Sequence, residues 1–178
     1  MKSKGGTIWF TGLHGSGKTT IANGLAEKLR KKGVCVVVID GDEVRKRVSS
    51  ELGYSKEDRD KHITRVAGIC EIISKSGVLN IACVASPTKS VREYAKSIIP
   101  DFMLVFVKCP IEVCEKRDVK GHYSKARTGE QGFEHFLGVN LEYEPPESLD
   151  LVLETDRETA QESVEKLFNW LAQKKWVF

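Results

Sequence analysis

The stretch Gly12-Leu-His-Gly-Ser-Gly-Lys-Thr-Thr20 directly follows the apolar run Thr7–Thr11 and opens a segment with helical periodicity. It matches the pattern G-x-x-x-x-G-K-[ST], in which glycines let backbone N–H groups turn inward around phosphate oxygens. The first turn of the following helix adds its positive end at the same place. We therefore predict a strand, a phosphate-binding loop and a helix in this order.

Two side chains of this loop have distinct predicted roles. Lys18, which we expect to face solvent while the loop is empty, would reach the β- and γ-phosphates of a nucleotide. The Thr19 hydroxyl would ligate Mg²⁺. The predicted nucleotide-binding residues of the loop are Gly12, Leu13, His14, Gly15, Ser16, Gly17, Lys18, Thr19 and Thr20.

Strand-like and helical patterns alternate along the chain. The runs expected to form strands are Thr7–Thr11, Val34–Ile39, Leu79–Ala85, Met103–Val107 and, more weakly, Leu151–Leu153. The run Val34–Ile39 does not alternate between apolar and polar residues, which predicts a strand covered on both faces. Helical patterns span Lys18–Lys32 and Lys56–Lys75, and a last helix would bury Val164, Leu167, Phe168 and Leu171. This order predicts a three-layer α/β domain around a parallel sheet.

Composition sets limits on the class of protein. The 178 residues, 40% hydrophobic and 30% charged, fit one soluble domain spanning 1–178, and the net charge of +3 gives no argument for nucleic acid as a partner. No segment looks like a signal peptide or a membrane span. The five cysteines are odd in number and form no C-x-x-C pair, so we expect thiols in a reducing cytoplasm.

Several classes of nucleotide-binding protein are possible. A dinucleotide-binding domain would place an acid where Asp40 lies. Its glycines would follow G-x-G-x-x-G, and the glycines of this chain do not. A GTP-dependent switch would carry N/T-K-x-D, and the nearest stretch, Thr88-Lys-Ser-Val91, lacks the acid. A motor or AAA-type ATPase would end an apolar strand in paired acids, whereas a glycine separates Asp40 from Asp42. A small-molecule kinase fits best.

Asp40-Gly-Asp42, followed by Arg45, lies at the end of the second predicted strand. Open α/β sheets bind ligands at this carboxyl edge. Asp40 would orient a Mg²⁺-bound water or accept a proton from an attacking hydroxyl, while Asp42 and Arg45 would hold the acceptor. The alternative is a turn with a helix cap and no ligand.

The stretch from about 117 to 146 differs from the rest of the chain. It is rich in charged residues and glycine and has little apolar periodicity. Such a segment is typical of a mobile lid over a ligand site.

These motifs resemble the adenylyl-sulfate (APS) kinase family. The resemblance runs in order through GLHGSGKTT, IDGDEVR, LGYSKEDR, ASPTKSVRE, CPIEVCEKRDVKGHYSKARTGE and NLEYEPPESLDLVLET. The string R-D-x-K-G-x-Y-x-x-A-R and the closing Y-E-x-P are specific to that family. The resemblance implies transfer of the ATP γ-phosphate to the 3′-hydroxyl of APS. It also implies a five-stranded parallel sheet, a lid, Mg²⁺ with ATP as co-substrate, and a homodimer.

The resemblance further implies roles for individual residues. Asp40 is the candidate base, and Lys18 and Lys120 would act on the transferring charge. Arg117 and Arg127 would be lid residues on the ATP side, and Phe136 would stack on the acceptor adenine. The implied acceptor-binding residues are Asp42, Arg45, Tyr54, Arg59, His62, Ser86, Pro87, Lys120 and Phe136.

The departures from the family pattern cluster on the acceptor side. His62-Ile-Thr-Arg65 replaces N-I-R-R, Gly121-His-Tyr123 replaces G-L-Y, and Phe136-Leu-Gly-Val139 replaces F-T-G-I, while Tyr54 stands where Phe is usual. On helical spacing, His62 and Thr64 are either solvated helix residues or contacts to the acceptor, and His62 would be cationic only when protonated. The alternatives to APS phosphorylation are transfer to another 3′-hydroxyl nucleotide, such as a cytidine diphosphate derivative, and nucleotide binding without turnover.

Overall fold

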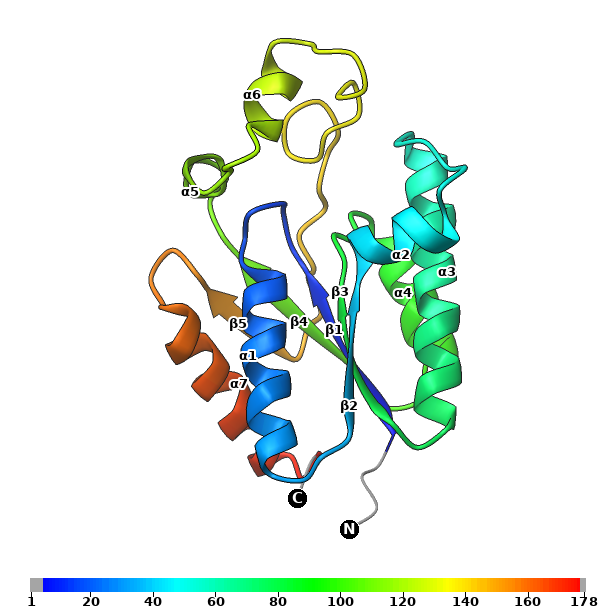
Figure 1. The fold of residues 1–178 in the computed structure, drawn as a ribbon, viewed down its shortest axis with the longest axis vertical. Helices are drawn as coiled ribbons and strands as arrows, with labels where there is room; N and C mark the ends of the chain where they lie inside the picture. The colour runs from blue at the N-terminus through cyan, green and yellow to red at the C-terminus, as the bar shows by residue number, and fades with distance from the viewer. Residues whose placement is uncertain (1–4, 177–178) are drawn as a thin grey trace.

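A parallel five-stranded sheet forms the centre of the molecule, seen in the computed structural model of residues 5–176 (Figure 1). The strand order is β2-β3-β1-β4-β5, and every neighbouring pair is parallel. The strands are β1 (Gly6–Thr11), β2 (Val36–Asp40), β3 (Leu79–Cys83), β4 (Phe102–Lys108) and β5 (Leu151–Glu154). All five predicted strands are present, and their bounds differ from the prediction by at most two residues.

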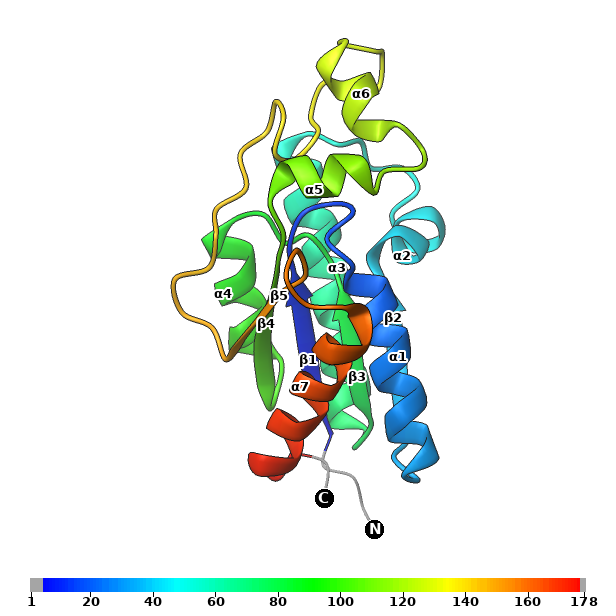
Figure 2. The same ribbon diagram turned by 90° about the vertical axis from the view of Figure 1, so that its left-hand side faces the viewer.

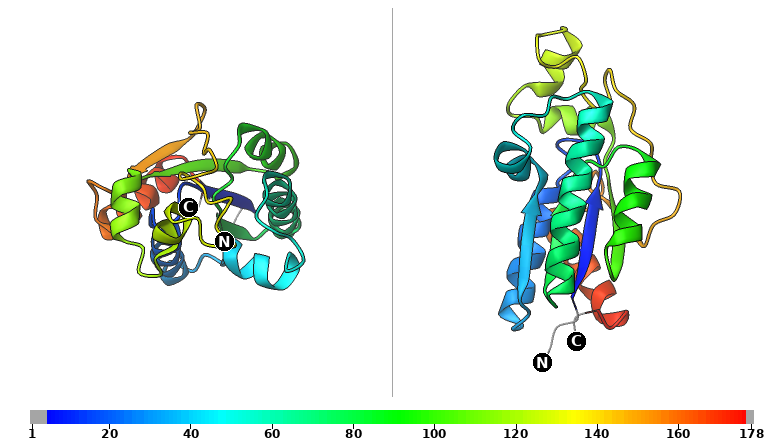
Figure 3. Two further views of the ribbon diagram at one scale, coloured as in Figure 1. Left: turned by 90° about the horizontal axis from the view of Figure 1, so that it is seen from above. Right: turned by 90° about the vertical axis from the view of Figure 1, so that its right-hand side faces the viewer.

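Two layers of helices cover the sheet. The helices α1 (Lys18–Lys31) and α7 (Ala160–Gln173) pack on one face, and α3 (Lys56–Lys75) and α4 (Lys89–Ile98) on the other (Figures 2 and 3). Because strand side chains alternate between faces, β1 contributes Ile8 and Phe10 to the core under α1 and α7, and Trp9 to the core under α3 and α4. The predicted three-layer α/β arrangement is confirmed.

The prediction that Val34–Ile39 is covered on both faces is wrong for part of the run. Strand β2 lies at the edge of the sheet, and Val37 is 38% exposed there. An edge strand has a neighbour on one side only, so the helices next to it cover less of its surface. The apolar run identified a strand correctly but not its place in the sheet.

Three short helices lie beyond the carboxyl ends of the strands. These are α2 (Gly41–Val48), α5 (Ile111–Lys116) and α6 (His122–Arg127), and α6 stands above the sheet in the predicted lid (Figure 1). Among residues 5–176, no helix combines the length and hydropathy needed to cross a membrane. All five cysteines are free thiols, and Cys35 is the exposed one among them.

His62 connects α3 to the segment that follows α2. Its side chain is buried, at 4% exposed, and Nδ1 lies 3.1 Å from the Ser49 hydroxyl. Arg65 donates to the carbonyl of Val48 at 2.7 Å on the same side. The interpretation of His62 as a solvated helix residue is therefore wrong, because α2 and the following turn cover it.

Burial lowers the pKa of His62 to about 4, and the neighbouring cation of Arg45 acts in the same direction. The imidazole is therefore neutral in the folded protein at pH 7. The family pattern N-I-R-R carries a positive charge that this chain lacks at Thr64. Protonation of His62 cannot supply that charge near neutral pH.

We predict that His62 makes the protein less stable in mild acid. As the pH falls from 6.5 toward 4, the unfolded chain takes up a proton on His62 that the folded chain does not, so the free energy of unfolding falls. The loss is at most about 3 kcal/mol. Urea unfolding at pH 7 and pH 5 measures it. His62→Asn should show a smaller difference between the two pH values, and His135→Asn, at an exposed position, should match the parent. An equal difference in all three proteins would contradict the prediction.

Candidate active site

A cavity of about 1230 Å³ opens at the carboxyl edge of the sheet, between the sheet and the lid. The phosphate loop and the start of α1 form its floor, α2 and α3 form one wall, and the lid and the loop after β5 form the other. Ligands of open α/β sheets bind at this edge. One cavity therefore joins the predicted nucleotide and acceptor residues.

The phosphate loop has the backbone that its glycines permit. Gly12 has φ 150°, and a Cβ there would lie 2.4 Å from the carbonyl of Val107. Gly15 has φ 77°, and its Cβ would lie 2.9 Å from the carbonyl of Cys114. Helix α1 then begins after Gly17, which supplies no side-chain cap. The first N–H groups of α1 are thus available to an anion.

Lys18 folds back onto its own loop. Its Nζ donates to the carbonyls of Gly12 and Leu13 at 2.9 and 2.7 Å. Desolvation lowers the pKa of Lys18. The expectation that this side chain faces solvent in the empty loop is wrong, because the loop carbonyls hold the ammonium group in the absence of phosphate.

Thr19 and Asp40 form a pair of oxygen ligands beside the loop. The Thr19 hydroxyl donates to Asp40 Oδ2 at 2.9 Å, and the N–H of Asp42 donates to Asp40 Oδ1 at 2.8 Å. Asp40 is therefore also the N-cap of α2. Hydroxyl and carboxylate oxygens are the donors that Mg²⁺ prefers, so these two residues fit that ion. The Asp40 carboxylate therefore caps α2, as the alternative interpretation of the sequence expected, and also has an oxygen beside the Thr19 hydroxyl.

Two arginines hold Tyr54 at the acceptor end of the cavity. The guanidinium carbons of Arg45 and Arg59 lie 4.9 and 5.3 Å from the centre of the Tyr54 ring. Arg45 also donates to the carbonyl of Gly53 at 2.8 Å. Burial lowers the pKa of Arg59 to about 10, assisted by Arg45, so both side chains are cationic at pH 7. They offer two positive charges and an aromatic face to an anionic ligand.

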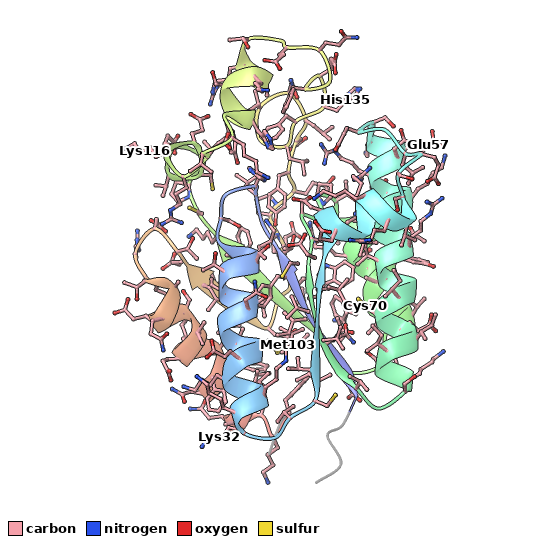
Figure 4. All side chains as sticks on the ribbon, in the orientation of Figure 1. Lys32, Glu57, Cys70, Met103, Lys116 and His135 are labelled. Carbon is pink, nitrogen blue, oxygen red and sulfur yellow. The ribbon has the colours of Figure 1, made fainter. Side chains whose placement is uncertain are left out.

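The lid contacts this wall through Arg59. Its Nη2 donates to the carbonyl of His135 at 2.6 Å, and Figure 4 shows His135 across from the end of α3 that carries Glu57. The ring of Phe136, next in the chain, meets that of Tyr123 edge-on, with centroids 4.9 Å apart. Phe136 belongs to a small apolar cluster around Cys109, Cys114 and Tyr123. The lid therefore has more packed apolar surface than its sequence indicates.

The two predicted acceptor-site residues after β3 differ in whether they line the cavity. Pro87 lines the cavity, whereas Ser86 is fully buried and does not. The Ser86 hydroxyl accepts from Trp9 Nε1 at 3.1 Å, and its carbonyl accepts from Arg92 at 2.8 Å. These bonds hold Ser86 at φ 37°, a conformation uncommon for residues other than glycine. Ser86 shapes the turn, and its side chain does not reach the predicted acceptor site.

The three predicted lid cations have different positions. Arg117 and Lys120 line the cavity, and Arg117 donates to the carbonyl of Thr155 at 2.6 Å. Arg127 does not line the cavity and forms an ion pair with Glu115 of α5. Of the phosphate-loop residues, Gly12, Leu13 and Ser16 lie behind the lining residues His14, Gly15, Gly17, Lys18, Thr19 and Thr20.

Sequence reasoning missed one part of the wall. Thr155, Glu158 and Thr159, in the loop between β5 and α7, line the cavity beside the phosphate loop. The Thr155 hydroxyl donates to the carbonyl of Ser16 at 2.9 Å. The weak fifth strand could have indicated this loop, because the carboxyl ends of parallel strands share one edge. Phe133 and Ser49 also line the cavity, and no sequence signal marks them.

The departures from the family pattern are not all at the cavity. His62, His122 and Leu137 line it. Thr64 does not: it is exposed, and its hydroxyl donates to the carbonyl of Asp60 at 2.9 Å on the outer side of α3. Thr64, which stands where the family pattern has an Arg, therefore lies away from the cavity.

Comparisons with known proteins identify the family that this chain resembles. Residues 4–154 match the family model described as adenylylsulphate kinase. The adenylyl-sulfate kinase of Halothermothrix orenii is 43% identical over 98% of this chain and 93% of its own length. A probable adenylyl-sulfate kinase of Synechocystis is 44% identical over 99% of both chains.

Solved structures show the same likeness. The Mycobacterium tuberculosis APS kinase in complex with AMPPNP and APS superposes with a TM-score of 0.88 at 36% identity, over 95% of this chain and 98% of that one. A hexameric APS kinase from Thiobacillus denitrificans superposes with a TM-score of 0.74 at 27% identity, over 99% of this chain and 30% of that one. With its phosphate loop, its lid and these relatives over nearly its full length, the chain belongs to the adenylylsulphate kinase family.

Proposed function

We propose that this protein transfers the γ-phosphate of ATP to the 3′-hydroxyl of APS, which gives 3′-phosphoadenylyl sulfate and ADP. The observation that carries the proposal is the single cavity with a phosphate loop at one end and Arg45, Tyr54 and Arg59 at the other. In-line transfer requires both substrates to meet in one space, and these two ends belong to the same cavity. The relatives named adenylyl-sulfate kinase support APS as the acceptor.

ATP binds at the phosphate-loop end. The N–H groups at the start of α1 and the Lys18 ammonium surround the phosphates, and Lys18 exchanges its loop carbonyls for phosphate oxygens. The nucleoside lies against Arg117, Thr155 and Thr159, which line the cavity next to the loop. This assignment adds the loop between β5 and α7 to the ATP site inferred from the motif.

APS binds at the other end. Arg45 and Arg59 face its phosphosulfate group, and the adenine stacks between aromatic side chains, of which Phe136 and Tyr54 line the cavity. Lys120, on the lid side of the same cavity, neutralises charge on the transferring group. Catalysis is mainly positioning and charge neutralisation, as expected for phosphoryl transfer.

Mg²⁺ is the proposed cofactor, held by Thr19 with Asp40 beside it. When bound, Mg²⁺ neutralises phosphate charge. Asp40 has two possible tasks in this position, which are to orient the metal's water shell and to accept the proton of the 3′-hydroxyl.

We propose that residues 1–178 form one kinase domain with its lid at about 117–146, and that the protein works as a homodimer in the cytoplasm. One sheet with helices on both faces supports a single domain. Five free thiols support a reducing compartment such as the cytoplasm. The family resemblance supports the dimer, although the Thiobacillus relative is hexameric. Light scattering after size-exclusion chromatography tests the assembly.

The acceptor is tested by measuring ADP release with three mixtures. ATP and APS together should give rapid release. ATP with a cytidine diphosphate derivative, and ATP alone, should give little. Faster release with the cytidine derivative than with APS would favour that second acceptor, for which the unusual His122 and Leu137 on the cavity wall are the motivation. Tight ATP binding without release in any mixture would indicate a nucleotide-binding regulator.

Lys18→Ala should abolish transfer while the fold remains. The Lys18 charge acts most strongly as the γ-phosphoryl group leaves, and losing one such donor typically costs about a hundredfold or more in rate. ADP release with saturating APS measures the effect, and circular dichroism checks the fold. Lys31→Ala, at the exposed end of the same helix, is the matched control. Parent-like turnover by a folded Lys18→Ala protein would rule out the phosphate-loop assignment.

Asp40→Asn should lower kcat by at least the roughly hundredfold typical of general-base loss. Asparagine keeps a side-chain oxygen for the cap of α2, so the local fold should persist. Glu43→Gln, one turn along α2 and exposed, is the control. Rates are measured over a range of Mg²⁺ concentrations. If excess Mg²⁺ restores the parent rate, Asp40 orients the metal's water shell and is not the base.

The lid should exchange its amide hydrogens quickly in the free protein and slowly with both substrates. Several of its contacts to the body are single hydrogen bonds, such as those of Arg59 with His135 and of Tyr123 with His14. Hydrogen exchange between residues 117 and 144 measures the change, and the amides of β1 serve as an internal control. Unchanged exchange in this stretch on adding ATP and APS would show that the lid does not close on substrate.

A further inference from the structure

Three side chains with metal-binding atoms meet where the lid touches the phosphate loop. His14 comes from the loop, Asp118 comes from the turn that leads into α6, and His122 is the first residue of α6. One ligand atom from each lies within 4.8 Å of the others, and the His14 and His122 ring centroids are 5.1 Å apart. The cluster is separate from the Thr19–Asp40 pair and differs from it chemically, because it offers imidazole nitrogen.

Asp118 is fixed in place before any ion arrives. Its side chain is 2% exposed, and its Oδ2 accepts from the N–H of Tyr123 at 2.8 Å. Its Oδ1 accepts from the N–H of Lys120 at a longer 3.3 Å and lies 3.8 Å from His14 Nε2. Backbone donors thus orient the carboxylate in the way that outer-shell groups orient metal ligands.

The distance between His14 and Asp118 fits two ligands of one ion better than a hydrogen bond between the two side chains. A separation of 3.8 Å between His14 Nε2 and Asp118 Oδ1 is too long for a hydrogen bond. Ligand atoms in a tetrahedral zinc site, with bonds of about 2.0–2.1 Å, lie roughly 3.3 Å apart. The three ligand atoms lie within 4.8 Å of one another, so they would have to approach by up to roughly 1.5 Å to reach that separation.

Charges of both signs lie near the cluster. Burial and the ammonium of Lys18 lower the pKa of His14, which keeps its imidazole in the neutral form that binds metals, while the carboxylates of Asp118 and Asp42 favour positive charge there. That ammonium is bonded to the carbonyls of Gly12 and Leu13. His14 and His122 line the cavity, so a fourth ligand position would open toward it.

We propose that His14, Asp118 and His122 bind one transition-metal ion of the Zn²⁺ class, and that the bound ion holds the lid on the phosphate loop. Two imidazoles and a carboxylate are ligands that suit Zn²⁺, whereas Mg²⁺ prefers the oxygen pair at Thr19. The lid already meets the loop here through the hydroxyl of Tyr123, which donates to the His14 carbonyl at 2.8 Å. A metal bridge adds to an existing contact.

Ring packing is the competing explanation for the two histidines. The ring of His122 also lies 5.5 Å from that of Phe133 and 6.3 Å from that of Phe136. Packing of this kind needs neither a nitrogen ligand nor Asp118. The two explanations therefore separate with His122→Phe, which keeps an aromatic ring, and Asp118→Asn, which keeps an acceptor for the N–H of Tyr123.

The experiment titrates Zn²⁺ into nucleotide-free protein in a calorimeter. All proteins carry Cys35→Ser, because this exposed thiol is a competing zinc ligand. The parent should bind one Zn²⁺ per chain, and His122→Phe and Asp118→Asn should each weaken binding by at least about tenfold. His135→Asn, a histidine of the same lid outside the cluster, should bind as the parent does. Hydrogen exchange of residues 117–123 should slow with Zn²⁺ in the parent and not in His122→Phe.

Equal Zn²⁺ affinity in the parent and His122→Phe would overturn the proposal, as would no binding by the parent. Binding without slower exchange of residues 117–123 would overturn the proposed hold on the lid. The titration contains no ATP or APS, so its result is independent of the acceptor. A failure of APS phosphorylation and a failure of this metal site are therefore seen in different measurements.

Discussion

The backbone of the phosphate loop is the constraint on which the rest of the site depends. Three glycines with positive φ carry the chain from β1, in the middle of the sheet, into α1 without a side-chain cap. The amide groups that a cap would satisfy elsewhere remain for a ligand. The carbonyl groups of the loop find partners among nearby side chains. Lys18 and Thr155 donate hydrogen bonds to them.

The lid contacts the phosphate loop and the rest of the molecule at several separate places. Tyr123 bonds to the carbonyl of His14, and Arg117 bonds to Thr155, which itself bonds to the loop. On the far side, Arg59 of α3 bonds to His135. Each of these polar contacts is a single hydrogen bond or a small pair of them, and one such bond is worth about 1 kcal/mol net. Contacts of this strength can position a lid and still allow it to open for substrate exchange.

On the acceptor side, the electrostatics follow from burial. Arg45 and Arg59 lie together around one tyrosine, and each makes the other's charge less favourable. The same two cations, with desolvation, keep His62 neutral. An anionic ligand relieves this repulsion between like charges. The positive charge at this end of the cavity would therefore favour an anionic ligand, and His62 is a neutral side chain beside Ser49.

The sequence alone was enough to predict the layers, the strands and the place of the glycine-rich loop between β1 and α1. Those predictions depend on local patterns: apolar runs, helical spacing, and a glycine-rich loop whose geometry is set by neighbouring residues. The edge position of β2, and hence the exposure of Val37, depends on strand order, which no local pattern encodes.

Tertiary structure decided which side chains reach the cavity. His62 is buried because α2 folds over it, Ser86 turns inward to Trp9, and Arg127 pairs with Glu115. Thr155 enters the site from a loop more than a hundred residues after the phosphate loop, and the cluster of His14, Asp118 and His122 likewise forms only when the lid meets that loop. Such contacts between distant segments depend on how elements pack, so residue type and spacing cannot predict them.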